Sequence, residues 1–240
     1  TSFSAVALQS VFCSLLFRWK FLNFQQFLDI CSRRRTASKE ENIPVLLDAV
    51  GIACSTLRRE YVKQLLNTAI PTVIKGNYSE IQALYQQSYR SSGVDADSGL
   101  DIRAMDQTAI FLARSLGTII LASGKVDIVT DGSCLYHICN GTPLLAQITG
   151  TGCLLGALCT AYLSAKPGLE AVITGCSILG ICGELAQTNL GTGTFLCRLM
   201  DALSTLPDTD LNEKIMMRYV RKMDMDSIDA IILAKADRLS

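Results

Sequence analysis

The sequence predicts an α/β fold with a mainly parallel central sheet flanked by helices and a helical C-terminal half. From residue 35 onward, short apolar runs bounded by turn residues alternate with stretches of helical period, as in sheets whose parallel strands are joined by helices. Beyond residue 150 the period is helical almost throughout. Apolar residues make up 49% of the 240 residues, enough for a substantial core, and no repeat or linker divides the chain. We therefore expect one folded domain.

Three strands are expected before the helical half. Residues 43–51 form an apolar run that predicts a buried strand ending at Asp48, and residues 71–77 predict a second strand that stops at a turn. A third strand is expected over residues 117–124. The segments VDIVTDG and CLYHICNG predict a hairpin that turns at the Asp-Gly pair, residues 131–132. This order favours parallel core strands with an antiparallel edge.

Helices are expected over residues 59–69 and 104–115, and again within 152–165, 168–190 and 194–206. Charged residues interrupt the last three segments, so we do not expect them to span a membrane. Small residues in these segments predict that the helices pack closely: Gly156, Ala157, Gly175, Gly180 and Gly183.

Charge and cysteine content exclude several classes of function. The 22 basic and 22 acidic residues balance, which leaves no basic face for nucleic acid. The ten cysteines are about 4% of the chain, below the roughly 8–10% of secreted disulfide scaffolds, so we expect reduced thiols and a cytoplasmic protein. His137 is the single histidine, and no Cys-x-x-Cys pair predicts a zinc site. The apolar run over residues 2–17 lacks the flanks of a signal peptide and is too short for a membrane span.

Polar residues at the carboxyl ends of the predicted strands are candidate ligand-binding residues, since ligands bind at that edge of such sheets. Asp48, Asn77 and Ser123 lie there. A carboxylate after a buried strand needs a partner such as a metal-bound phosphate, although Asp48 is alternatively a cap or turn residue. Lys75 can neutralise a phosphate. Glu80 can hold Mg²⁺ through water, or else simply begins a helix, where the dipole favours acidic residues.

The stretch TGTGC, residues 149–153, predicts an anion-binding turn. Gly150, Thr151 and Gly152 let backbone N–H groups approach an anion, and the helix that begins near Cys153 points its positive end at the same place. Thiols at helix N-termini ionise more readily than others. Cys153 is therefore a candidate base that takes the proton of a substrate hydroxyl as this hydroxyl attacks a phosphoryl group. The alternative is a small core cysteine at a tight glycine turn.

Five motifs in this order resemble the hydroxyethylthiazole kinase family, of ribokinase-like fold: PVLLDAVG, VIKGNYSE, LASGKVDIVTDG, NGTPLLAQITGTGC and GTGTFLCRLMDAL. The likeness covers residues 35–206 and leaves a divergent segment, residues 1–34, and a tail, residues 207–240. The resemblance implies ATP-dependent phosphorylation of the hydroxyl of hydroxyethylthiazole in thiamine salvage, with Mg²⁺ and a homotrimer. A related small-molecule kinase of the same fold and an inactive remnant are the alternatives.

The resemblance also implies roles for single residues. Asp48 and Glu80 match the family's metal-associated carboxylates, and Cys153 matches its catalytic base. Lys75 and Ser123 stand where the family has an Arg and a Thr that contact ATP.

The remaining site residues come from two sources. Gly150 matches a glycine that contacts the substrate, and Asn77 joins the ATP-binding residues by its place at the strand end. Residues 1–34 lack the family's methionine-bearing substrate loop, so we expect a truncated or altered N-terminal region and weak thiazole binding.

Overall fold

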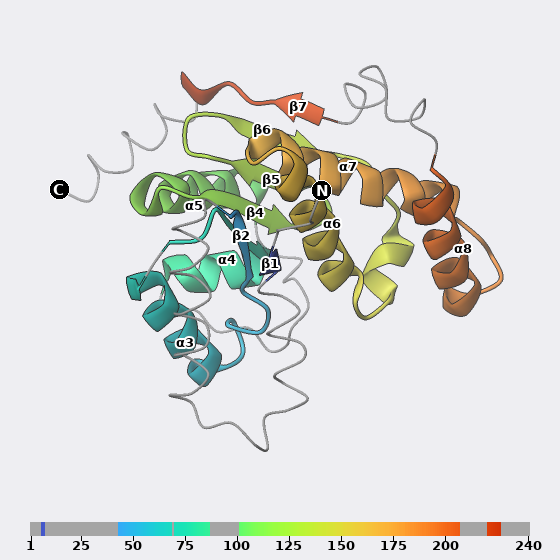
Figure 1. Ribbon diagram of the computed structural model, residues 1–240, viewed down its shortest axis with the longest axis horizontal. Helices are drawn as coiled ribbons and strands as arrows, with labels where there is room; N and C mark the ends of the chain where they lie inside the picture. Colours follow the sequence, from blue (N-terminus) through green and yellow to red (C-terminus); the bar gives the residue numbers. More distant parts are fainter. Residues whose placement is uncertain (1–5, 8–42, 69, 87–100, 207–219, 227–240) are drawn as a thin grey trace.

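The computed structural model describes residues 6–7, 43–68, 70–86, 101–206 and 220–226 (Figure 1). Within them, seven strands form one sheet in which the spatial order follows the chain order. The strands are β1 (Val6–Ala7), β2 (Val45–Asp48), β3 (Val73–Asn77), β4 (Ile119–Ser123), β5 (Asp127–Thr130), β6 (Leu135–Ile138) and β7 (Val220–Lys222).

The sheet is parallel on one side and antiparallel on the other. β1 to β4 pair in parallel, whereas β4 to β7 pair antiparallel. This confirms the predicted parallel core strands and the β5–β6 hairpin, whose turn begins at Asp131. β1 and β7 extend the sheet at its two edges and were not predicted, because both lie outside the segments with clear strand patterns. The rest of the apolar run over residues 2–17 lies outside the described residues.

The helices confirm the predicted alternation and the helical C-terminal half. Four of the five predicted helices begin and end within three residues of their predicted bounds, and the short α4 occupies the place where Glu80 alternatively begins a helix. The described part contains no helix that is long and apolar enough for a membrane span. The helices are α3 (Thr56–Thr68), α4 (Tyr78–Tyr85), α5 (Ile102–Leu116), the 3₁₀ helix η1 (Pro143–Gln147), α6 (Thr151–Ala165), α7 (Leu169–Leu185) and α8 (Thr192–Thr205).

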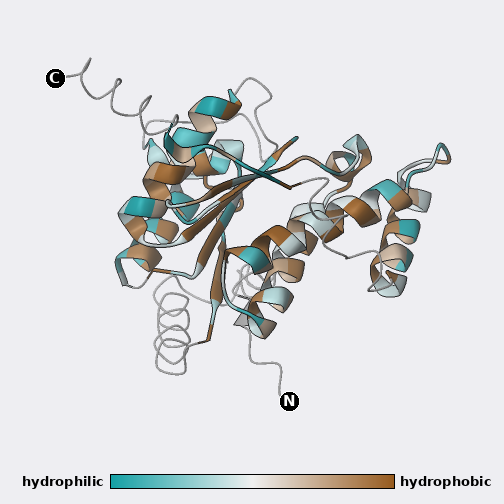
Figure 2. Ribbon diagram, turned by 90° about the horizontal axis from the view of Figure 1, so that it is seen from above, coloured by the Kyte–Doolittle hydropathy of each residue, from teal (hydrophilic) through white to brown (hydrophobic). Residues whose placement is uncertain are grey.

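Helices cover both faces of the sheet, and alternate strand residues enter separate cores. In β2, Val45 and Leu47 pack with residues of α3, α4 and α5. Leu46, between them, packs with α6, α7 and α8 on the other face. This period of two explains why the strands read as continuous apolar runs, since both of their faces are buried. Figure 2 shows the mostly hydrophobic strands between the two helical layers.

Candidate active site

A buried ion pair joins the neighbouring parallel strands β2 and β3. Lys75 is the register partner of Asp48, and its Nζ lies 3.1 Å from Asp48 Oδ2. The two residues are only 4% and 2% exposed. Burial by itself lowers the pKa of Lys75, but the nearby Asp48 carboxylate outweighs this effect, so the pKa lies above its usual value. Among the described residues, Asp48 Oδ1 is a buried oxygen without a hydrogen-bond partner, which is uncommon for a buried polar atom and would be explained by a bound ion or water.

The Lys75 ammonium points towards the N-terminus of α6. A Cβ at Gly152 would stand 3.7 Å from Lys75 Nζ. Gly150 precedes the helix in the left-handed region, with φ of 103°, and no side chain caps this end. Gly150 and Gly152 are exposed, and the first N–H groups of an α-helix have no acceptor within the helix. A cation and a helix N-terminus thus converge on one point, where an anion would be stabilised.

Cys153 lies at the same point. Its thiol is close enough to Lys75 to contribute to the raised pKa of that ammonium group. Cys153 is partly exposed, whereas Cys159, further along α6, is fully buried in the core. A core role therefore fits Cys159, and Cys153 occupies the first turn of the helix beside the candidate anion site.

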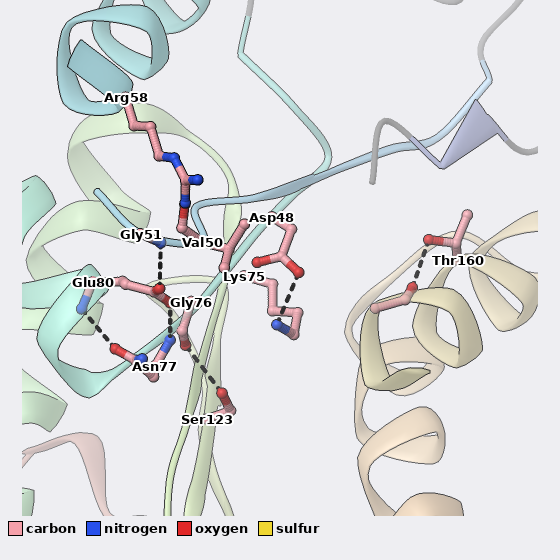
Figure 3. A network of polar contacts seen from close by, with 11 residues as sticks. Asp48, Val50, Gly51, Arg58, Lys75, Gly76, Asn77, Glu80, Ser123 and Thr160 are labelled. Atoms are coloured by element: carbon pink, nitrogen blue, oxygen red, sulfur yellow. Dashed lines mark hydrogen bonds and ion pairs between the residues drawn. The ribbon is translucent and has the colours of Figure 1, made fainter. Parts of the chain in front are cut away.

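Glu80 and Asn77 form a capping box at the start of α4. Glu80 accepts hydrogen bonds from the backbone N–H of Gly51 at 2.6 Å and of Asn77 at 2.7 Å, and Asn77 Oδ1 accepts one from the N–H of Glu80 at 2.9 Å (Figure 3). Burial raises the pKa of Glu80, although the two N–H donors act in the opposite direction. The contacts of Glu80 with Asn77 are therefore those of a residue that begins a helix, which was the alternative interpretation. Each carboxylate oxygen still has a second lone pair for a water molecule.

Ser123 ends β4 beside Asn77, its register partner, and its hydroxyl donates to the carbonyl of Gly76 at 3.3 Å. Sequence reasoning missed Asp127, which accepts from the N–H of Gly124 at 3.0 Å. Burial raises the pKa of Asp127 to about 6, while that N–H and the Lys75 charge lower it in part. Because β5 runs antiparallel to β4, its first residue lies at the edge where β4 ends. That topology is the signal by which Asp127 could have been found.

The carboxylates are suited to a hydrated magnesium ion rather than to a metal held by protein ligands alone. No group of three or more His, Cys, Asp or Glu side chains within the described ranges is arranged to hold a metal ion. Asp48 and Glu80 lie near enough for the charge of Asp48 to act on Glu80. Magnesium commonly binds one or two carboxylates and keeps several waters beside substrate phosphates. The unpartnered oxygen of Asp48 fits that arrangement.

Comparisons with known proteins agree with this architecture. A hydroxyethylthiazole kinase from Staphylococcus aureus is 36% identical over 212 residues, which cover 86% of this chain and 79% of the relative. Hydroxyethylthiazole kinase 2 from a Clostridium botulinum type A strain is 37% identical over 182 residues, or 73% of this chain and 68% of the relative.

Solved structures show the same fold. The hydroxyethylthiazole kinase protein from Pyrococcus horikoshii OT3 superposes with a TM-score of 0.70 at 26% identity, covering 85% of this chain and 74% of that one. Pyridoxal kinase from S. aureus, at 22% identity and a TM-score of 0.50, covers 65% of this chain and 57% of its own. These neighbours confirm the ribokinase-like fold. A model described as the hydroxyethylthiazole kinase family matches residues 25–209, and the chain therefore belongs to this family.

Proposed function

We propose that the protein transfers the γ-phosphoryl group of ATP to the hydroxyl of hydroxyethylthiazole, a step of thiamine salvage. The observation that carries the proposal is the convergence of Lys75 Nζ and the N-terminus of α6 on one point beside the exposed Gly152. Phosphoryl transfer is catalysed chiefly by positioning and by charge stabilisation, and these groups supply both. The names of the relatives support hydroxyethylthiazole as the acceptor, and the geometry supports this turn as the place of transfer.

The anion-binding turn, Gly150 to Gly152, would hold the phosphoryl group through its N–H groups. Cys153 would act as the base: its thiolate takes the proton of the substrate hydroxyl, the oxygen forms a bond to the γ-phosphorus, and the bond from this phosphorus to the leaving ADP oxygen breaks. Lys75 offsets the charge that the phosphates bring. Gly150, the exposed first residue of the turn, would also contact the thiazole substrate.

Magnesium and ATP complete the proposal. Asp48 and Glu80 would hold the ion through its water molecules, and the ion would neutralise the phosphate charge of ATP. Lys75, Asn77 and Ser123 would contact ATP, because they occupy neighbouring strands at the edge where the turn also lies. Asn77 already caps α4, so its contact with ATP would use donors and acceptors outside the capping bond.

The test is ATP turnover with hydroxyethylthiazole as acceptor, beside pyridoxal, hydroxymethylpyrimidine and a control without acceptor. We expect phosphorylated thiazole and ADP in equal amounts, with much lower rates for the other acceptors. Turnover that prefers pyridoxal or hydroxymethylpyrimidine would assign another substrate to the site. ADP formation that does not depend on any acceptor would contradict the proposed transfer.

We also propose a homotrimer and a cytoplasmic location. The trimer agrees with a group of large apolar side chains that lie exposed at the α7–α8 end, a surface suited to a second subunit: Leu185, Leu190, Leu196 and Met200. Light scattering should give three times the chain mass of 26.0 kDa. A mass of one chain at micromolar concentration would contradict the trimer. The location rests on the low cysteine fraction of the sequence.

A further inference from the structure

The chain between β6 and α6 is held by three hydrogen bonds, two to α7 and one to Gln187 just after it. Asn140 Nδ2 donates to the carbonyl of Ser177 at 2.7 Å, and the N–H of Gly141 donates to Glu184 Oε1 at 2.8 Å. Just beyond the end of α7, Gln187 Nε2 donates to Thr142 Oγ1 at 2.9 Å. The α7 partners follow at helical spacing, so the connection lies along the helix over about two turns.

Two glycines of α7 leave the room that this contact requires. A Cβ at Gly180 would stand 2.3 Å from the amide carbon of Asn140, and a Cβ at Gly183 would stand 2.9 Å from Leu145 Cδ1. Gly141 itself has a φ of 109°, in the region that favours glycine. Side chains at these positions would push the connection away from α7. The glycines of both segments therefore permit the close approach of the connection to α7.

The connection between β6 and α6 leads directly into the anion-binding turn. It contains η1, and the first residue of α6, Thr151, donates its hydroxyl to two carbonyls there. Thr151 Oγ1 lies 2.8 Å from the carbonyl oxygen of Leu145 and 3.1 Å from that of Ile148. Thr151 is also the middle residue of the turn. The position of the turn thus depends on η1, and the position of η1 depends on α7.

We propose that Glu184 is a positioning residue for the anion-binding turn: by holding Gly141, it fixes η1 and so places the N–H groups of Gly150 to Gly152 against the transferred phosphoryl group. The second half of this inference rests on the proposed function. Glu184 acts through a backbone N–H and not through contact with the substrate. A displacement of about 1 Å at a reacting group is sufficient to lower a rate by about a hundredfold.

The experiment compares Glu184→Ala, Glu184→Gln and Gly183→Ala with the full-length protein. Glu170→Ala is the matched control, because Glu170 lies on the same helix but pairs with the exposed Lys166. We expect Glu184→Ala to lower kcat about tenfold to hundredfold, with the KM for ATP within about threefold. Glu184→Gln keeps an oxygen that accepts the Gly141 N–H, so it should restore most of the rate. Gly183→Ala should act like Glu184→Ala.

Hydrogen exchange supplies a readout that does not need activity. The N–H groups of Leu145, Ile148 and Leu154 are bonded within η1 and the start of α6, and in Glu184→Ala they should exchange about tenfold faster. If the unaltered protein phosphorylates no acceptor, the proposed function fails and exchange alone decides the positioning role. Unchanged exchange in Glu184→Ala would overturn the inference. So would a Glu184→Gln variant as slow as Glu184→Ala, since the charge would then matter rather than the hydrogen bond.

Discussion

Lys75 and Asp48 form an ion pair that is almost fully buried, and such pairs seldom stabilise a fold more than apolar residues would. The presence of these two buried charges is better explained by the groups that lie near them. Lys75 is aimed at the anion-binding turn, and Asp48 keeps one oxygen without a partner among the described residues. Both features suit a polyanionic ligand with its metal ion, and the family membership of the chain agrees with this interpretation.

Replacing Lys75 with methionine should destabilise the protein by about 3–5 kcal/mol, because the Asp48 carboxylate would remain buried without its cation. Urea unfolding at neutral pH measures the loss. Lys63→Met is the control, since Lys63 pairs with Glu60 at the surface, and it should change stability by at most about 0.5 kcal/mol. The double variant Asp48→Asn/Lys75→Met should recover much of the loss. A Lys75→Met protein as stable as the unaltered protein would show that the pair is not buried in solution.

Cys153→Ser should lower turnover by about 10²–10⁴-fold while ATP binding is retained, since a serine hydroxyl is a far weaker base and the backbone of the turn is unchanged. Cys153→Asp places a carboxylate at the same point and should recover part of the rate. Turnover at several pH values and ATP binding by calorimetry measure both effects. Equal rates for the cysteine and serine proteins, with serine less stable, would make Cys153 a packing residue.

The sequence identifies Asp48, Lys75 and Cys153 as candidates from separate motifs, but it does not show that they meet. Lys75 reaches the N-terminus of α6 only because β2 and β3 pair in register and α6 packs on that face. Glu80 was proposed from its chemistry as a metal-associated carboxylate, with a helix start as the alternative. The capping box with Asn77 confirms the helix start and leaves the metal role a proposal.

At the scale of elements, α6 and α7 cross closely because Gly175 has no side chain. A Cβ there would stand 2.8 Å from Cys159 Sγ and 3.0 Å from the Cys159 backbone, which cannot move aside easily. Gly175→Ala should therefore destabilise the protein by about 1–3 kcal/mol. Gly193→Ala in α8 is the matched control, since its Cβ would meet nothing within 4 Å, and it should stabilise by up to about 1 kcal/mol. Thermal unfolding of both variants measures these changes in stability. Equal changes for Gly175→Ala and Gly193→Ala would contradict the close packing of α6 against α7.

The turn of the β5–β6 hairpin should make a small, pH-dependent contribution to stability. Asp131 Oδ1 accepts from the N–H and hydroxyl of Ser133 and from the N–H of Cys134, at 2.8–2.9 Å. Burial opposes this effect, but the hydrogen bonds outweigh it and lower the pKa of Asp131. The stabilisation is therefore present above the ordinary aspartate pKa, near 3.8, and is lost as the pH falls through the lower folded value.

Asp131→Ala should destabilise the protein by at most about 1 kcal/mol at pH 7, because Asp131 is exposed and solvent screens its charge. The difference from the unaltered protein should shrink at pH 3, where the carboxylate begins to lose its charge. Urea unfolding at both pH values measures it. Asp131→Asn keeps an acceptor oxygen but cannot titrate, so it should cost less at pH 7. An equal loss for Asp131→Ala at both pH values would contradict the role of the ionised form.

The bounds of strands and helices with strong sequence patterns were predicted to within a few residues. Examples are β2 and β3, which are apolar on both faces, and the amphipathic α5. The elements missed are short or depend on distant partners. β7 has three residues and is a strand only because β6 offers an open edge. The role of α7 in holding the β6–α6 connection was missed as well, because the glycines at 180 and 183 were interpreted as helix-packing positions alone.

At the scale of the whole molecule, the candidate site joins the two helical layers. Asp48, Lys75 and Asn77 belong to strands of the sheet, Glu80 belongs to α4 on one face, and the anion-binding turn begins α6 on the other. A ligand that touches all of them bridges elements on both faces of the sheet. Ligand binding should therefore oppose unfolding of the whole chain and not only of a loop.

MgATP at about 100 times its dissociation constant should stabilise the folded state by about 2.7 kcal/mol. For a chain of 240 residues this corresponds to a rise in Tm of about 5–10 °C. ATP with a chelator should give a smaller rise, because the metal-mediated contacts of Asp48 and Glu80 would be lost. Asp48→Asn should reduce the effect of adding Mg²⁺, whereas the exposed control Glu60→Gln should respond like the unaltered protein. An equal rise in Tm with and without Mg²⁺ would remove both carboxylates from the metal site and leave Lys75 and the anion-binding turn as the phosphate contacts.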